Sequence, residues 1–131
     1  MIKPLSSSQL VRSILWGAAL WFFAALLLRY LGPLGIFDGF ARVVLYALVI
    51  PGTVPFVWAT PNVTGTDRSQ LVLSLAAADA AALLLDGMAV AWLPILYGAE
   101  RSLVLGSAAV ILWGAGIVLM LAFIMQGKQP S

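Results

Sequence analysis

The sequence predicts an all-α polytopic membrane protein, a four-helix bundle whose helices cross the bilayer in an up-down-up-down order. Of its 131 residues, 63% are hydrophobic and only 9% are charged, whereas about 25% of the residues of a soluble domain are charged. The apolar residues also form long continuous stretches, and about 20 such residues span the hydrocarbon core of a bilayer as a helix. A soluble domain of this size cannot bury so much apolar surface. We therefore expect the lipid bilayer to surround a single transmembrane domain, residues 1–131.

The first helix is expected over residues 12–31. Its apolar run is longer than that of a signal peptide, and no small-residue cleavage site follows Arg29-Tyr30. We expect an uncleaved helix for these reasons. Gly32-Pro33 should end it, because proline cannot donate a backbone hydrogen bond.

The second helix is expected over residues 39–60 and contains the motif Pro51-Gly52 with Pro55. Pro51 cannot donate to the carbonyl of Ala47, so we expect a kink there. Transporters use discontinuous helices of this composition at their binding sites. Both interpretations of the motif stay open at the level of sequence.

The third and fourth helices are expected over residues 69–93 and 101–126. Asp67, followed by Gln70 three residues later, predicts a capping box before the third helix. The connections between helices are short, so sequential helices should be antiparallel neighbours.

The basic residues are distributed slightly unequally between the two sides of this topology. Lys3, Arg12, Arg68 and Lys128 fall on the side of the two termini, and Arg29, Arg42 and Arg101 on the other side. Because positive residues are retained in the cytoplasm, both termini are expected there. The expected location is the bacterial inner (plasma) membrane.

Asp86 is the second of two acidic residues within the third helix, after Asp79. A charged Asp at the bilayer centre costs about 2.5–3.5 kcal/mol on insertion scales, so this side chain should face the other helices. Arg29 and Arg42 lie at a similar expected depth, and a guanidinium–carboxylate pair stabilises a buried charge. We expect Asp86 to pair with one of them, as a structural ion pair or as part of a substrate or proton path. The remaining alternative is that Asp86 reaches an aqueous cavity.

Asp79 lies seven residues before Asp86 and so on the same face of the helix. It shares its expected depth with Thr53, and no basic residue is within easy reach. One interpretation is a neutral carboxyl that donates to a carbonyl freed by Pro51 or Pro55. The other is a proton or ion site, because acidic residues within the membrane are often functional.

The sequence lacks the residues that several kinds of chemistry require. The chain has no Cys and no His, which removes thiol chemistry and the usual zinc, copper and haem ligands. We expect no metal, no cofactor and no catalytic residue, since no nucleophile stands with a base. The net charge of +2 and the scattered basic residues give no reason to expect nucleic acid as a partner.

Most of the sequence resembles a bacterial family of small four-helix integral membrane proteins of unknown function. The resemblance rests on the segments 15–17, 21–24 and 29–32 in the first helix, and on segments 84–89 and 108–114 later in the chain. Arg29 and Asp86 fit the pattern of that family, whereas a less polar residue is expected at Asp79. The resemblance implies four helices and an inner-membrane location, and it implies no activity.

These observations lead to two functional hypotheses. The first is a non-enzymatic structural or accessory component that acts as a homo-oligomer or within a larger membrane protein complex. The alternative is a small proton- or ion-coupled transporter or channel that uses Asp79 and Asp86.

Overall fold

The computed structural model describes residues 3–127, and within this range it is all-helical. Four long helices follow one another along the chain, and three short 3-10 helices lie between them. The long helices are α1 (Ser7–Leu31), α2 (Gly39–Thr64), α3 (Leu71–Trp92) and α4 (Arg101–Met125). Each is long and apolar enough to cross a membrane.

Helix α1 and the short 3-10 helix before α3 each begin with a capping box. Ser6 accepts a hydrogen bond from the backbone N–H of Gln9, and the Gln9 side chain accepts one from Ser6, which completes a capping box. The 3-10 helix η1 (Gly32–Leu34) contains Pro33 and follows α1. The capping box expected before α3 is also present, since the Gln70 side chain accepts from the backbone N–H of Asp67 at 2.9 Å.

Two helix boundaries differ clearly from the sequence prediction. Helix α1 begins at Ser7 rather than near residue 12, because the capping box starts the helix within a polar stretch. Helix α2 continues through Pro61 to Thr64 rather than ending at residue 60. It ends at Gly65, whose φ of 71° is in the left-handed region that glycine adopts without a steric penalty.

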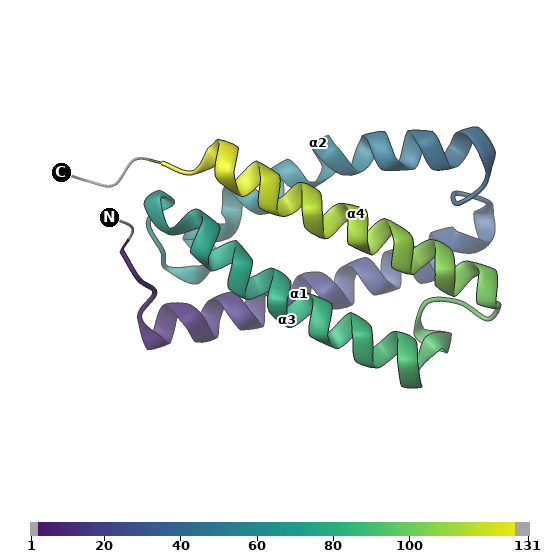
Figure 1. Cartoon of the computed structure of the whole chain (residues 1–131), viewed down its shortest axis with the longest axis horizontal. Coiled ribbons are helices and arrows are strands. Elements are labelled where there is room, and N and C mark those ends of the chain that lie inside the picture. The colour runs from purple at the N-terminus through teal and green to yellow at the C-terminus, as the bar shows by residue number, and fades with distance from the viewer. Residues whose placement is uncertain (1–2, 128–131) are drawn as a thin grey trace.

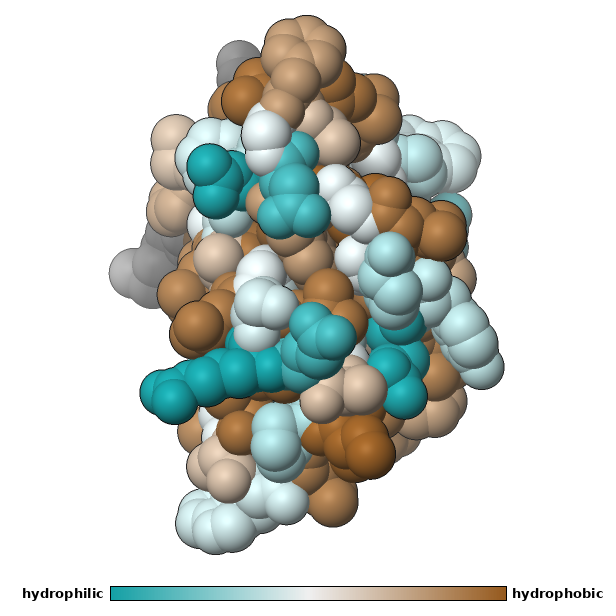
Figure 2. Space-filling view, turned by 90° about the vertical axis from the view of Figure 1, so that its right-hand side faces the viewer, coloured by the Kyte–Doolittle hydropathy of each residue, from teal (hydrophilic) through white to brown (hydrophobic). Residues whose placement is uncertain are grey.

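The two ends of the molecule are chemically different. The two termini lie at one end in Figure 1, and the segments that join α1 to α2 and α3 to α4 lie at the other. We call these the terminal end and the loop end. Figure 2 looks onto the loop end and shows hydrophilic side chains across it, between hydrophobic ones. The charged residues that the chain contributes to this end are Arg29, Asp38, Arg42, Glu100 and Arg101.

Helix α3 is the most buried of the four, and its most extensive contact is with α1. The two helices approach closely where Gly17 faces the backbone of Ala78, since a Cβ atom added to Gly17 would overlap the Ala78 carbonyl. Ala78 itself belongs to a buried cluster with Leu75 and, from α4, Ala122. Small residues therefore let the backbones of α1 and α3 meet, and α4 covers the same region.

Candidate functional site

A chain of three polar side chains lies inside the bundle toward the loop end. The hydroxyl of Tyr97 donates to an oxygen of Asp86 at 2.5 Å, and the indole N–H of Trp21 donates to the same hydroxyl at 3.1 Å. Trp21 comes from α1, Asp86 from α3, and Tyr97 from the segment between α3 and α4. We call these three residues the inner triad. It connects two helices and a loop through a buried hydrogen bond between Tyr97 and Asp86 and a part-buried one between Trp21 and Tyr97.

Tyr97 reaches the interior because the segment between α3 and α4 folds back onto the bundle. Helix α3 ends at Trp92, and the 3-10 helix η3 (Pro94–Leu96) turns the chain so that the N–H of Tyr97 donates to the carbonyl of Pro94. The Tyr97 side chain is 0% exposed and packs in a cluster with Ala25 and Ala89. The segment is apolar apart from its last residue, Glu100. Burial of the Tyr97 ring removes hydrophobic surface from water, while Leu93 and Ile95 stay exposed.

The electrostatic environment of the Tyr97 phenol keeps it protonated at neutral pH. Burial raises the pKa of Tyr97 above its ordinary value of about 10. The hydrogen bond to Asp86 raises the pKa further, because deprotonation of the phenol would break this bond. Tyr97 is thus available as a hydrogen-bond donor to Asp86.

The partner of Asp86 differs from the one expected from the sequence. Asp86 is 9% exposed and accepts from Tyr97, and within residues 3–127 no ion pair within 4 Å joins it to Arg29 or Arg42. A phenol meets the hydrogen-bonding requirement of the carboxyl group without bringing a second charge into the interior, where desolvation is costly. The expected structural ion pair is therefore replaced by a tyrosine–carboxyl hydrogen bond.

Asp79 and Thr53 are not brought together by a hydrogen bond. Asp79 is half-buried, and its Oδ2 atom is buried without a hydrogen-bond partner among the described residues. The Thr53 hydroxyl donates to the carbonyl of Ile50 in its own helix at 3.1 Å. Of the two residues, only Asp79 has a buried polar atom free for another contact.

The motif Pro51-Gly52 with Pro55 lies within one unbroken helix. Helix α2 contains both prolines and Pro61 between its two ends, and its axis bends along its length in Figure 1. A discontinuous helix of the transporter kind is thus not formed here. Gly52 faces open space, since no atom lies within 4 Å of the position that a Cβ would occupy.

A second polar network holds the helices together at the terminal end. The fully buried Gln70 side chain donates to the carbonyl of Pro4 at 3.0 Å, while Gln9 donates to the carbonyl of Gly65 at 2.9 Å. Deeper in the bundle, the hydroxyls of Ser13 and Ser74 lie 2.8 Å apart. These bonds connect α1, the end of α2 and the start of α3.

Helix α4 is fastened to the same end by a reciprocal pair of contacts. The Arg68 guanidinium donates to the carbonyl of Met125 at 2.7 Å, near the end of α4. In return, the Gln126 side chain accepts from the backbone N–H of Val72 at 2.9 Å. Each side chain satisfies a backbone group that a helix end leaves without a partner. Lys128, which the orientation argument also used, lies outside the described residues.

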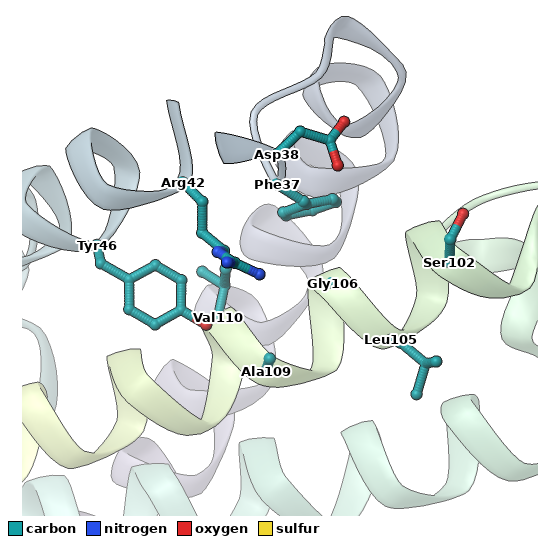
Figure 3. A pocket seen from close by; sticks show the side chains of 9 residues that line it. All are labelled: Phe37, Asp38, Arg42, Tyr46, Ser102, Leu105, Gly106, Ala109 and Val110. Carbon is teal, nitrogen blue, oxygen red and sulfur yellow. The ribbon is translucent and has the colours of Figure 1, made fainter. Parts of the chain in front are cut away.

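A pocket of about 330 Å³ opens between α2 and α4 near the loop end. In Figure 3 the side chains of Arg42 and Tyr46 extend from α2 toward α4, whereas the carboxylate of Asp38 points away from the guanidinium. The pocket is lined by Phe37, Asp38, Arg42, Tyr46, Ser102, Leu105, Gly106, Ala109 and Val110. We call it the α2–α4 groove. It combines a cation at one side with an apolar floor.

Tyr97 is the residue of the inner triad that the sequence analysis missed. The available signal was the composition of its segment: between Leu93 and Glu100 the chain is apolar, although a connection between membrane helices is usually polar. The hydrogen bond of Trp21 to Tyr97 was likewise not predicted. Within residues 3–127 no group of three or more His, Cys, Asp or Glu residues could hold a metal ion.

Comparisons of this chain with protein-family models, with curated proteins and with solved structures found no match. The resemblance to a bacterial family of small membrane proteins therefore stays a prediction.

Proposed function

We propose that this chain is a multi-pass protein of the bacterial inner membrane, with its helices in up-down-up-down order and both termini in the cytoplasm. Its four apolar helices support membrane insertion. In the sequence, four basic residues fall on the side of the termini and three on the other, which favours the side of the termini for the cytoplasm under the positive-inside rule.

Within the membrane, the protein acts as a non-enzymatic structural or accessory component. The observation that carries this proposal is the contrast between its interior and its exterior. Inside, the inner triad uses its polar groups to fasten helices to one another. Outside, large apolar side chains are exposed on every long helix, among them Phe23, Trp58, Leu84 and Ile124. Such a bundle is a rigid unit with a broad surface for lipids and for other membrane helices.

Assembly through this exterior is supported by glycines on three of the helices. Gly52 in α2, Gly87 in α3 and Gly116 in α4 have no atom within 4 Å of a Cβ position. Small residues on an outer face let a neighbouring helix approach closely, which is how helices associate in membranes. The protein accordingly works as a homo-oligomer or within a larger membrane complex.

Native mass spectrometry of the protein extracted from its own membrane in a mild detergent tests this role. We expect a homo-oligomer or a complex of defined stoichiometry with other membrane proteins. Gly52→Leu, Gly87→Leu and Gly116→Leu then form a matched set, because each adds bulk only to an outer face. The variant whose new leucine lies on the contact face should dissociate the assembly. A monomer without protein partners under all extraction conditions would refute the accessory role.

A second candidate function, proton- or ion-coupled transport, is favoured by one observation. The Oδ2 atom of Asp79 is buried and lacks a hydrogen-bond partner among the described residues, and a carboxyl group in this state can bind and release a proton or cation. Proton-linked flux into proteoliposomes should then fall to background in Asp79→Asn. Asp38→Asn, at the loop end, is the control that should retain it. Equal flux in protein-free and protein-containing vesicles would exclude this candidate.

A further inference from the structure

We infer that the α2–α4 groove binds one phospholipid with an anionic headgroup, whose phosphate contacts Arg42 and whose acyl chain lies along α4. This inference rests on the membrane placement proposed above. It assigns a ligand to a site that neither proposed function uses.

Arg42 supplies the positive charge of the groove. Its guanidinium makes no ion pair within 4 Å among residues 3–127, although Asp38 lies one helical turn away. The carboxylate of Asp38 points away from it in Figure 3. A guanidinium on the lipid-facing side of a bundle is stabilised by an anion, and a phosphodiester accepts two parallel hydrogen bonds from it.

The polar side chains of the groove lie at the depth of the lipid headgroups. Arg42 lies one turn into α2 and Ser102 at the first turn of α4, which places both where a transmembrane helix meets the headgroup layer. The phenol of Tyr46 lines the same groove. Arginine and tyrosine both concentrate at this layer, with an apolar stem in the hydrocarbon and a polar tip toward the headgroups. Of these side chains, Arg42 and Tyr46 both extend into the groove in Figure 3, and both can donate hydrogen bonds to a headgroup.

The floor of the groove is apolar. Leu105, Gly106, Ala109 and Val110 present an apolar surface from α4. Ala109 adds little bulk to this floor, and Gly106 lets the ring of Phe37 pack against α4, since an added Cβ would lie 2.6 Å from that ring. An acyl chain is the apolar group that the bilayer supplies at this position. A charged headgroup site above an apolar channel matches an anionic phospholipid at both of its ends.

The test is native mass spectrometry of delipidated full-length protein in detergent micelles, titrated with phosphatidylglycerol and phosphatidylethanolamine. Wild type should bind one phosphatidylglycerol about fivefold more tightly than phosphatidylethanolamine, the factor that one arginine contributes near an anionic lipid. In Arg42→Gln the ratio of the affinities for the two lipids should be near one. Arg101→Gln, at the same end but outside the groove, should leave it unchanged. Ala109→Leu retains Arg42 and fills the floor, so it should reduce binding of both lipids.

Two results would overturn this inference: equal binding of the two lipids by wild type, or an equal loss of preference in Arg42→Gln and Arg101→Gln. The second result would indicate general attraction by the loop end rather than a groove. Both failures differ from failure of the membrane placement, which would appear as extraction of the protein from membranes by alkaline carbonate without detergent. Circular dichroism of each variant verifies that its helices form.

Discussion

The hydroxyl of Tyr97 lies 2.5 Å from a carboxyl oxygen of Asp86, so a residue from a connecting segment satisfies an acidic group in the interior of α3. The same hydroxyl accepts a hydrogen bond from Trp21 in α1. One phenol thus joins the loop end of the molecule to two of its helices.

Replacing Tyr97 with Phe should lower the free energy of unfolding by about 1–3 kcal/mol, since it leaves Asp86 and Trp21 without their buried partner. Equilibrium unfolding in mixed micelles measures this loss. Tyr30→Phe is the matched control: Tyr30 is 74% exposed, and its substitution should leave stability unchanged. Equal stability of the Tyr97→Phe variant and wild type would mean that the hydrogen bond contributes nothing.

Stability should also depend on alkaline pH through Tyr97. Burial and the bond to Asp86 raise its pKa in the folded protein, while the unfolded chain titrates near the ordinary value of about 10. Below that pH both states keep the proton, and the contribution of Tyr97 is constant. Above it, the unfolded state loses its proton first, so stability should fall by up to about 1.4 kcal/mol per pH unit. Tyr97→Phe should remove this slope, and its persistence in that variant would assign the slope to another group.

Replacing Gly17 with Ala should destabilise the contact between α1 and α3, because the new Cβ would overlap the carbonyl of Ala78. Overpacking of this kind costs about 1–3 kcal/mol. Gly87→Ala is the control: it also lies within a helix but faces open space. That variant should equal or exceed wild-type stability, since Ala favours helices over Gly by about 1 kcal/mol. A Gly17→Ala variant as stable as Gly87→Ala would contradict the close approach of the two helices.

Replacing Gln70 with Leu should loosen the terminal end. The Gln70 side chain is fully buried, accepts from the N–H of Asp67 and donates to the carbonyl of Pro4. Its loss removes these two hydrogen bonds, and each contributes about 0.5–1.5 kcal/mol to stability. Hydrogen exchange should become faster at the Asp67 amide and unchanged at Tyr97. Protection of Asp67 at the wild-type level would show that Gln70 does not hold this end.

The helices themselves were predictable, because a long apolar run followed by Gly32-Pro33 or preceded by Gly39 has few alternatives. Two boundaries were missed because they depend on local bonding rather than on hydropathy. The capping box of Ser6 and Gln9 extends α1 into a polar stretch. Loss of the N–H of Pro61 is tolerated in α2, which continues to Thr64 before Gly65 ends it.

The interior polar contacts were less predictable, since they depend on tertiary structure. The sequence indicated that Asp86 needs a partner inside the bundle, and the periodicity of α3 placed it on an inner face. The expected depth in the membrane alone favoured Arg29 and Arg42 as partners of Asp86. It could not reveal that the segment carrying Tyr97 folds inward, because that depends on packing against Ala25 and Ala89 from two different helices.

A double-mutant cycle between Asp86 and Tyr97 tests most directly whether the interior polar groups fasten this bundle. Asp86→Leu, Tyr97→Phe and the double variant are unfolded in the same mixed micelles as wild type. We predict a coupling energy of about 0.5–3 kcal/mol, the range for residues in direct contact. Additive effects of the two substitutions, with a coupling energy near zero, would contradict the account.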